Sequence, residues 1–190
     1  MSLSESQEQI LDAAMQCISR DGIEGASMRS VAREADVSLG LLSYHFDGKE
    51  DLIQAAFQLA CDRVYDVTLA AVDATDDAAE QVRSYVRGPF HDDFLADDYL
   101  ALRIGLWAIA RTDPTIAAVE QSLYERYTHR LADLIVGSDS TVRRSVARDR
   151  ATDVVVRQNG LWLNWARCQN AVDLRRGLEQ CEALALGFVA

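Results

Sequence analysis

The amino-acid sequence predicts an all-α fold. Apolar residues recur at helical spacing along most of the chain, and no strand-like alternation of apolar and polar residues persists. Capping residues stand before several of these apolar runs, where their side chains can accept hydrogen bonds from the free N–H groups of a helix start. Only two of the 190 residues are prolines, so few positions interrupt a helix. These observations predict about nine helices.

The first predicted helix follows Ser4 and Gln7, which have the spacing of a capping box. Apolar residues then occur at i, i+3, i+4, i+7 and i+8, which places them on one helical face: Ile10, Ala13, Ala14, Cys17 and Ile18. We expect this helix to end near residues 21–22, where a glycine follows an aspartate.

Two short helices with a tight turn between them are predicted next. Ser27 is a suitable N-cap for the first, whose apolar face consists of Met28, Val31, Ala32 and Ala35. Residues 36–38 turn the chain, and Ser38 can cap a second helix with Leu41 and Leu42 on its inner face. This arrangement is typical of a helix-turn-helix, in which the second helix enters the major groove of DNA.

The rest of the chain reads as further helices. Asp47 and Glu50 have capping-box spacing at the start of a long helix that reaches about residue 72. Asp113 and Pro114 supply a cap and an N1 proline for another start. The expected helices beyond residue 73 are 79–87, 95–111, 114–136, 143–167 and 173–188.

Composition excludes several classes of protein. No run of eighteen apolar residues occurs and no basic segment precedes an apolar one, so we expect neither a membrane span nor a secretory signal. Cys17, Cys61, Cys168 and Cys181 are scattered without C-x-x-C spacing, which favours structural thiols in a reducing cytoplasm over disulfides or metal ligands.

The charge limits how the chain could bind nucleic acid. The net charge is −11, and the first sixty residues hold four basic and ten acidic residues, which gives −6. Many DNA-binding domains are basic, so any affinity here must depend on where the few basic side chains lie. The same deficit keeps an alternative open, namely a helical ligand-binding or adaptor protein without operator binding.

The N-terminal third resembles a known family. The pattern Ser-x-Arg-x-Val-Ala-x-x-Ala-x-Val-Ser-x-Gly-x-Leu begins at Ser27, and Tyr-His-Phe-x-x-Lys-Glu-x-Leu begins at Tyr44. Together they resemble the N-terminal signature of the TetR family of transcriptional regulators. One departure is Ser43, which stands where the family usually carries an aromatic residue. The resemblance implies a DNA-binding repressor that responds to a small molecule.

The predicted DNA contacts come from the helix-turn-helix and the residues beside it. Leu39 could contact a thymine methyl group, Ser43 a base edge, and Arg29 a guanine or a phosphate. Tyr44 and His45 are phosphate contacts by resemblance to the family. The complete predicted set is Ser27, Arg29, Ser38, Leu39, Gly40, Ser43, Tyr44, His45 and Lys49. The alternatives are an ordinary surface arginine at Arg29, a surface ion pair at Lys49 and a packed ring at His45.

A second domain and a second subunit are expected. We assign residues 1–50 to DNA binding and 51–190 to effector binding and dimerisation. A single helix-turn-helix reads half a site, so a homodimer on a double-stranded DNA operator is predicted. The last two helices carry more apolar surface than one packed face needs. The predicted interface is Leu161, Trp165, Leu178, Cys181, Leu184 and Phe188, unless these residues are all buried within the monomer.

The C-terminal half resembles the choline-responsive BetI branch of the family. The matching segments are Leu-Arg-x-x-Leu-Trp ending at Trp107, Ala-x-x-Asp-Pro ending at Pro114 and Gly-Leu-Trp-Leu beginning at Gly160. The resemblance implies a quaternary ammonium or another small cation as effector, bound over aromatic faces. The predicted ligand-binding residues are Phe94, Trp107, Tyr124, Tyr127 and Trp162, although both tryptophans could instead be core residues.

An all-α enzyme is the rival prediction from another class. The three histidines His45, His91 and His129 are far apart in sequence, and neither metal-ligand spacing nor a nucleophile–base pair is recognisable. We therefore expect no catalytic residues, no metal site and no cofactor.

Overall fold

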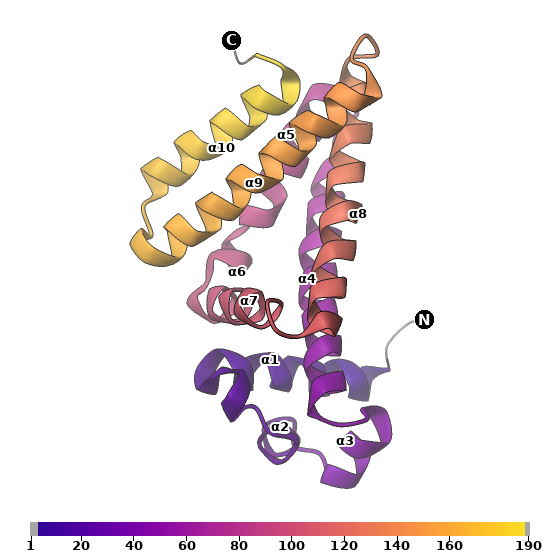
Figure 1. Cartoon of the computed structure of the whole chain (residues 1–190), viewed down its shortest axis with the longest axis vertical. Helices are drawn as coiled ribbons and strands as arrows, with labels where there is room; N and C mark the ends of the chain where they lie inside the picture. Colours follow the sequence, from indigo (N-terminus) through magenta and orange to yellow (C-terminus); the bar gives the residue numbers. More distant parts are fainter. Residues whose placement is uncertain (1–3, 189–190) are drawn as a thin grey trace. The chain divides into compact units, whose positions relative to one another are not determined.

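The computed structural model describes residues 4–188, and all regular structure in that range is helical (Figure 1). The all-α prediction is confirmed. In chain order the elements are α1 (Glu5–Gly25), α2 (Met28–Glu34), α3 (Leu39–His45), α4 (Lys49–Asp73), α5 (Ala78–Arg87), the 3-10 helix η1 (Gly88–Phe90), α6 (Asp92–Leu95), α7 (Asp97–Ile109), α8 (Pro114–Ser138), α9 (Arg144–Cys168) and α10 (Ala171–Leu186).

The helices form two compact units. The first unit is built from Met1–Asp62 and Ala96–Glu120, and the second from Arg63–Leu95 and Gln121–Ala190. Helices α4 and α8 each begin in the first unit and end in the second. These units follow packing, whereas the predicted boundary at residue 50 separates functions, and that boundary stays a prediction.

Helix α1 buries the predicted apolar face. Ile10, Ala13, Ala14, Cys17 and Ile18 are all buried, and this face packs against α2 and α7 in the core of the first unit. The capping box at its start is present, with Ser4 and Gln7 each bonded to the other's backbone. Near its end Gly22 has a φ of 71°, a left-handed conformation that glycine adopts without a steric penalty.

The predicted helix-turn-helix is present as α2 and α3. The Ser27 hydroxyl accepts a hydrogen bond from the backbone N–H of Ser30, and the Ser38 hydroxyl accepts one from Leu41. One predicted inner residue is wrong: Leu42 is fully buried, but Leu41 is 38% exposed. Adjacent residues point about 100° apart around a helix, so both leucines of this seven-residue element could not face the same core.

Two other local predictions differ from the structure. At the start of α4, the Asp47 N–H donates to the Asp51 carboxylate at 2.9 Å, in place of the predicted pairing with Glu50. The segment 95–111, expected as one helix, is divided into α6 and α7 because Ala96 has an extended backbone, with φ −68° and ψ 147°. At α8 the prediction is confirmed: the Asp113 carboxylate accepts hydrogen bonds from the N–H groups of Thr115 and Ile116.

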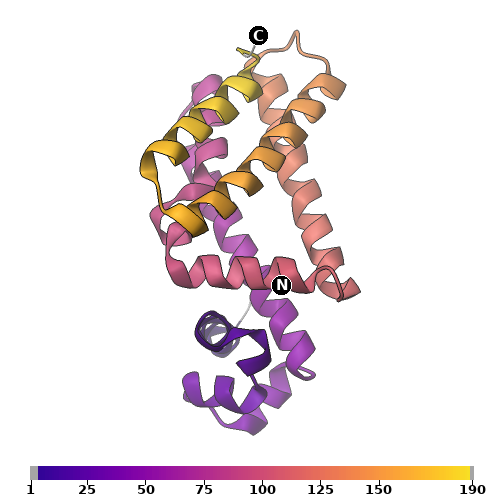
Figure 2. The ribbon, with the colours of Figure 1, turned by 60° about the vertical axis from the view of Figure 1, so that its left-hand side comes forward.

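The second unit is organised around the antiparallel pair α9 and α10, which lie side by side in both views (Figure 1 and Figure 2). Helix α5 packs against α10. Helices α9 and α10 approach closely at Gly177, where an added Cβ would lie 2.2 Å from Leu161 Cδ2. Within residues 4–188, no helix combines the length and the apolarity that a membrane crossing requires.

Candidate functional site

Helix α3 presents an accessible surface formed by the residues that do not face the core. Leu39, Gly40, Ser43 and Tyr44 are exposed, and the Tyr44 side chain keeps 82% of its accessible area. Leu41 lies on the accessible side as well. The Tyr44 ring meets the His45 ring edge to face, with centroids 5.2 Å apart. An apolar and hydroxyl-bearing surface of this kind can contact thymine methyl groups, base edges and phosphates.

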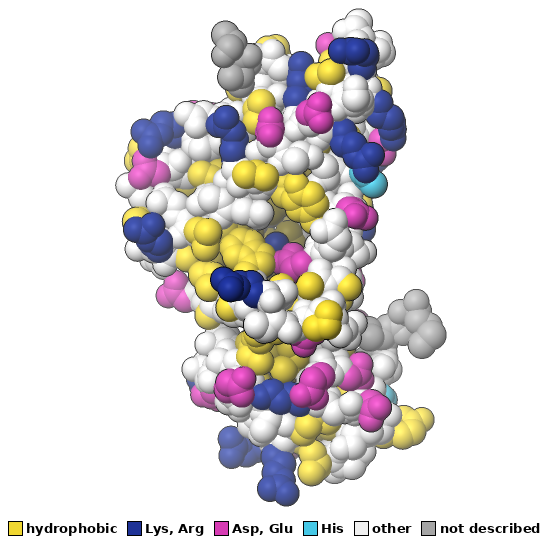
Figure 3. Space-filling view, in the orientation of Figure 1, with side chains coloured by type: hydrophobic (Ala, Val, Ile, Leu, Met, Phe, Trp, Pro, Cys, Tyr) yellow, Lys and Arg dark blue, Asp and Glu magenta, His cyan; other side chains and the backbone are white. Residues whose placement is uncertain are grey.

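Helix α2 adds basic side chains to the first unit's surface. Arg29 and Arg33 are exposed, and within residues 4–188 neither forms an ion pair. Figure 3 shows basic side chains at the lower end of the view, over α2, with several acidic side chains above them. The two guanidinium groups are therefore available to bind an anion.

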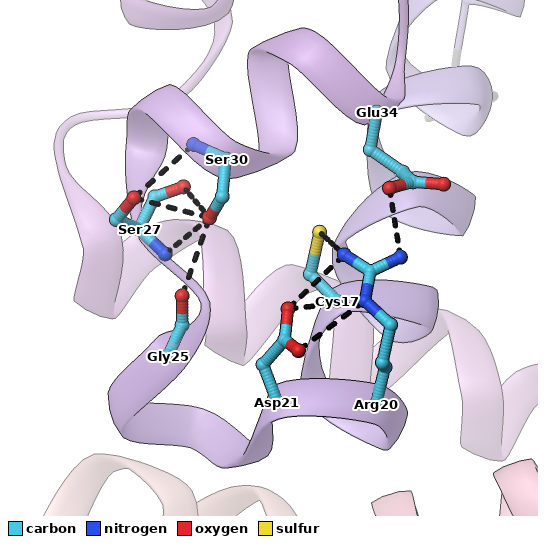
Figure 4. A network of polar contacts seen from close by, with 7 residues as sticks. All are labelled: Cys17, Arg20, Asp21, Gly25, Ser27, Ser30 and Glu34. Carbon is cyan, nitrogen blue, oxygen red and sulfur yellow. Dashed lines mark hydrogen bonds and ion pairs between the residues drawn. The ribbon is translucent and has the colours of Figure 1, made fainter.

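A third basic residue, Arg20, is already neutralised (Figure 4). Its guanidinium donates to the Asp21 carboxylate at 3.0 and 3.1 Å and to Glu34 at 3.0 Å, and it also contacts the Cys17 sulfur at 3.7 Å. Its hydrogen bonds to Asp21, followed by those to Glu34, raise the pKa of Arg20 above its ordinary value. Arg20 therefore joins α1 to α2 and is not available for DNA.

Two of the predicted DNA contacts, Ser27 and Lys49, form hydrogen bonds within the protein. The Ser27 and Ser30 hydroxyls lie 3.0 Å apart beside the carbonyl of Gly25 (Figure 4). The Lys49 ammonium donates to the carbonyl of Glu24 at 3.2 Å, which ties the start of α4 to the end of α1. The phosphate contact of Lys49 stays a prediction.

Trp107, a predicted effector residue, lies in the first unit with a cation over its ring. The Arg103 guanidinium carbon is 5.0 Å from the indole centroid. The same guanidinium contacts the Cys61 sulfur at 3.4 Å and lies 3.8 Å from Glu120 Oε1. Burial is the main cause that raises the pKa of the Cys61 thiol to about 12. Arg103 Nε and Glu120 Oε1 are buried without a hydrogen-bond partner.

The other predicted effector residues belong to the second unit. The Tyr127 ring packs on Tyr85 at 4.5 Å, and each hydroxyl donates to the other residue's carbonyl. The Trp162 ring packs on Phe90 at 5.2 Å. Phe94 is buried and Tyr124 is half-buried. Part of the aromatic surface that we expected to face a ligand is therefore in contact with other rings.

The second unit also contains a hollow of about 400 Å³. Its lining comes from α4, α5, η1 and α6: Val67, Ala71, Ser84, Arg87, Gly88, Phe90, His91 and Asp92. None of the five residues Phe94, Trp107, Tyr124, Tyr127 and Trp162 lines it.

The predicted dimer residues differ in their accessibility. Phe188 is exposed, whereas Leu161, Leu178 and Leu184 are half-buried against the second unit's core. The Trp165 indole N–H donates to the carbonyl of Leu95 at 3.0 Å. Cys181 is buried inside its own subunit, and we do not include it in the interface proposed below.

One exposed apolar position on α9 was not predicted from the sequence. Val156 keeps 59% of its accessible area, and Gly160 and Leu163 follow at i+4 and i+7 on the same face. Val156 ends a run of three consecutive valines, a pattern in which helical spacing cannot identify the outward residue. Within the described residues, no group of three or more His, Cys, Asp or Glu could hold a metal ion.

Two family models match the chain in consecutive segments. Residues 10–56 match the model of bacterial regulatory proteins of the tetR family. Residues 78–189 match the C-terminal model of BetI-type transcriptional repressors. The first segment contains α2 and α3, and the second contains Trp107 and the α9–α10 pair.

Individual proteins are similar over nearly the whole chain. The HTH-type transcriptional regulator BetI of Burkholderia cenocepacia is 26% identical over 172 residues, which cover 90% of this chain and 87% of the relative. A candidate transcriptional regulator of Pseudomonas aeruginosa PAO1 has a crystal structure that superposes with a TM-score of 0.83 at 25% identity, covering 96% of this chain and 89% of that one.

A further crystal structure, from Saccharomonospora viridis, contains a protein in complex with choline. It superposes with a TM-score of 0.78 at 21% identity and covers 94% of each chain, which shows a shared fold. The helix-turn-helix, the two matching models and the similarity over most of the chain agree with one another. The chain belongs to the tetR family of bacterial regulatory proteins, with a C-terminal part of the BetI type.

Proposed function

We propose that this ligand-responsive, DNA-binding transcriptional regulator represses genes from a pseudo-palindromic operator and is released by a small cation. The observation that carries the proposal is the capped α2–α3 pair, with Leu39, Gly40, Ser43 and Tyr44 on its accessible surface. Binding to chromosomal DNA implies that the protein acts in the cytoplasm of its cell.

The proposed DNA-binding domain is residues 1–50. Leu39, Gly40 and Ser43 contact base edges, and Arg29, Tyr44 and Lys49 bind phosphates together with His45 and the two capping serines, Ser27 and Ser38. The local charge of −6 over the first sixty residues favours few phosphate contacts. Acidic neighbours weaken the attraction between the basic side chains and the DNA phosphates. Specificity then depends on apolar and hydroxyl contacts in the major groove.

The proposed dimer forms through the exposed face of α9 together with α10, within residues 51–190. Val156 and Leu163 expose apolar surface on either side of Gly160, which has open space around it in the subunit. A glycine in the middle of a helix costs about 1 kcal/mol relative to alanine, and close approach of a second backbone would explain its presence. Phe188 and the half-buried Leu161, Leu178 and Leu184 add apolar area, and Trp165 contributes the edge of its indole.

The proposed effector is a quaternary ammonium or another small cation. The BetI-type C-terminal match and the choline complex of the Saccharomonospora viridis protein support this class. In this chain the indole of Trp107 is the proposed cation site, because its ring is already in contact with a cation. Roles for Phe94, Tyr124, Tyr127 and Trp162 in holding the rest of a ligand stay predictions.

Release of the DNA would follow from a shift in the populations of two protein conformations. An effector that binds better to a conformation with low DNA affinity moves the protein into that conformation by the difference in binding free energy. Helices α4 and α8 contain residues of both compact units, so they are the elements through which a change in one unit could reach the other.

DNA binding is tested by fluorescence anisotropy with the region upstream of the protein's own gene. We expect Lys49→Ala and Tyr44→Phe to weaken binding, while Arg143→Ala, an exposed change just before α9, leaves it unchanged. Arg29→Ala should also reduce the dependence of the binding constant on salt by about one unit of slope per contact. Binding that is unchanged in the first two variants would show that the phosphate assignments are wrong.

Effector response is tested on the same complex. Tetramethylammonium or choline should release the DNA in a saturable manner, and NaCl at matched ionic strength should not. A cation that binds the protein but leaves the DNA affinity unchanged would contradict the coupling. A dimer that binds neither its upstream region nor other DNA would favour the alternative of an adaptor protein without operator binding.

A further inference from the structure

The proposed cation site on Trp107 is occupied by the protein's own Arg103. The guanidinium lies over the indole at 5.0 Å, which is within the range for an attractive cation–π contact. Both residues belong to α7, four positions apart on one face of the helix. A free cation could use this face of the indole only after Arg103 had left it.

The remaining contacts of Arg103 are weak for a guanidinium that is largely removed from water. Its Nη1 contacts the Cys61 sulfur at 3.4 Å, and because burial raises the pKa of that thiol to about 12, the sulfur is neutral near pH 7. Its Nη2 lies 3.8 Å from Glu120 Oε1, which is too far for a hydrogen bond. The Glu120 carboxylate is thus the main group that balances the charge of Arg103, although the two groups form no hydrogen bond.

Two unsatisfied atoms belong to this incomplete pair. Arg103 Nε is a buried donor without an acceptor, and Glu120 Oε1 is a buried acceptor without a donor. Leaving charged groups without hydrogen bonds in a buried position is costly. An arginine and a carboxylate that meet side by side form two parallel hydrogen bonds, and this geometry would satisfy both atoms.

We propose that Arg103 is a built-in competitor of the effector: a cationic ligand replaces it over the Trp107 indole, and the displaced guanidinium forms a two-bond pair with Glu120. This inference rests on the proposed function, since it requires a cationic effector at Trp107. The ligand exchanges one cation for another at the ring, and the completed Arg103–Glu120 pair offsets only part of the cost of displacing Arg103. Glu120 is the last residue of the first unit, within the helix that continues into the second.

If Arg103 competes with the ligand, its substitution should increase the affinity for the ligand. Replacing a residue that holds a ligand weakens binding, whereas replacing a competitor strengthens it. Arg103→Met should therefore bind tetramethylammonium more tightly than the wild type, by up to about 30-fold, because the removed cation–π contact contributes at most about 2 kcal/mol and the lost pair with Glu120 offsets part of it. Trp107→Leu should lose most of the binding. Titration calorimetry with tetramethylammonium chloride measures both.

The chain offers a matched control in its second unit. Arg126 lies over the Tyr65 ring at 4.3 Å, so Arg126→Met removes a contact of the same kind at another place. We expect this variant to bind tetramethylammonium as the wild type does. Equal strengthening in Arg103→Met and Arg126→Met would show a general effect of lost positive charge, and it would overturn the proposal.

A second comparison preserves the test if Arg103→Met alone does not fold. The double variant Arg103→Met/Glu120→Gln removes both charges, and it should bind more tightly than Glu120→Gln, in which Arg103 stays over the ring. Circular dichroism confirms that both are folded. Binding by the double variant that is no tighter than that of Glu120→Gln would overturn the competitor role.

The outcomes separate this inference from the proposed function. If Trp107→Leu weakens binding but Arg103→Met does not strengthen it, the cation site stands and the competitor role is wrong. If Trp107→Leu binds tetramethylammonium as tightly as the wild type, the cation site is wrong and the competitor role fails with it. If Arg103→Met and the wild type both fail to bind the cation, the effector class is wrong as well.

Discussion

The Arg87 guanidinium holds the Glu182 carboxylate through two parallel hydrogen bonds, Nε to Oε1 at 2.6 Å and Nη2 to Oε2 at 2.9 Å. The pair joins α5 to α10 across 95 positions of sequence. The Glu182 side chain is buried, while Arg87 remains about half exposed and also approaches Glu80. The hydrogen bonds to Glu182 are the main cause that raises the pKa of Arg87 above its ordinary value.

Because Glu182 is buried and Arg87 is half exposed, substitution of one or the other should lower the free energy of unfolding by different amounts. Arg87→Met leaves a buried carboxylate without its donors and should lower the free energy of unfolding by about 2–3 kcal/mol. Glu182→Gln keeps an acceptor in place and leaves an arginine that water can reach, so it should cost only about 1 kcal/mol. Urea denaturation at pH 7 measures both. A larger loss in Glu182→Gln would contradict the assignment of Glu182 as the buried partner.

The two adjacent leucines of α3 should respond differently to truncation. Leu42→Ala removes a fully buried side chain and should cost about 2–4 kcal/mol of stability, including the cavity that it leaves. Leu41→Ala changes an exposed position and should stay within about 0.5 kcal/mol of the wild type. Thermal denaturation distinguishes the two variants. Similar losses in both would show that Leu41 faces the core after all.

Gly160 and Gly137 form a matched pair for testing the dimer face. Both have open space where a Cβ would be added, so alanine is tolerated at either position in a single subunit. If a second copy packs on Gly160, Gly160→Ala should raise the dimer dissociation constant by about tenfold or more, which corresponds to a clash of about 1.4 kcal/mol. Sedimentation equilibrium measures the constant. Gly137→Ala should leave it unchanged, and a dimer equally stable in both variants would place the interface elsewhere.

Alkaline pH should destabilise the fold through its buried thiols. Burial is the main cause that raises the pKa of Cys61 to about 12 and that of Cys181 to about 11, from an ordinary value of 9.0. Above pH 9 the unfolded chain releases these protons while the folded chain retains them. The stability that they contribute is thus complete below pH 9 and is lost as the pH rises toward 11 and 12.

The measurement is the urea midpoint of unfolding between pH 8 and pH 11. The midpoint should fall with rising pH in the wild type, and it should fall less steeply in Cys61→Ala and Cys181→Ala. Cys168→Ala serves as the control, because this cysteine is exposed. A slope that is the same in all four proteins would exclude the buried thiols as its source.

Structural features that depend on neighbours along the chain could be predicted from the sequence. The caps at Ser4, Ser27, Ser38 and Asp113 are hydrogen bonds between residues two or three positions apart, and each is present. The apolar face of α1 follows in the same way from a repeat of 3.6 residues. The family resemblance could be seen from the sequence because its motif is continuous.

Other features could not be predicted, because they depend on which distant surface packs against an element. The pattern Leu41–Leu42 permits either residue to face inward, and the packing of the first unit selects Leu42. The Lys49 ammonium finds its carbonyl 25 positions away at Glu24. Likewise, Tyr127 and Trp162, which we expected to face a ligand, pack against the distant rings of Tyr85 and Phe90.

The sequence alone therefore determined most of the helices, most of their caps and the family, since backbone hydrogen bonds and periodic burial act within a few residues. Tertiary structure decided which charges are neutralised and which remain available. Arg20 pairs with Glu34 across 14 positions, and Arg103 contacts Cys61 across 42. The physical reason is that a contact between residues far apart in the chain depends on their distance in space, which only the packing of the helices establishes.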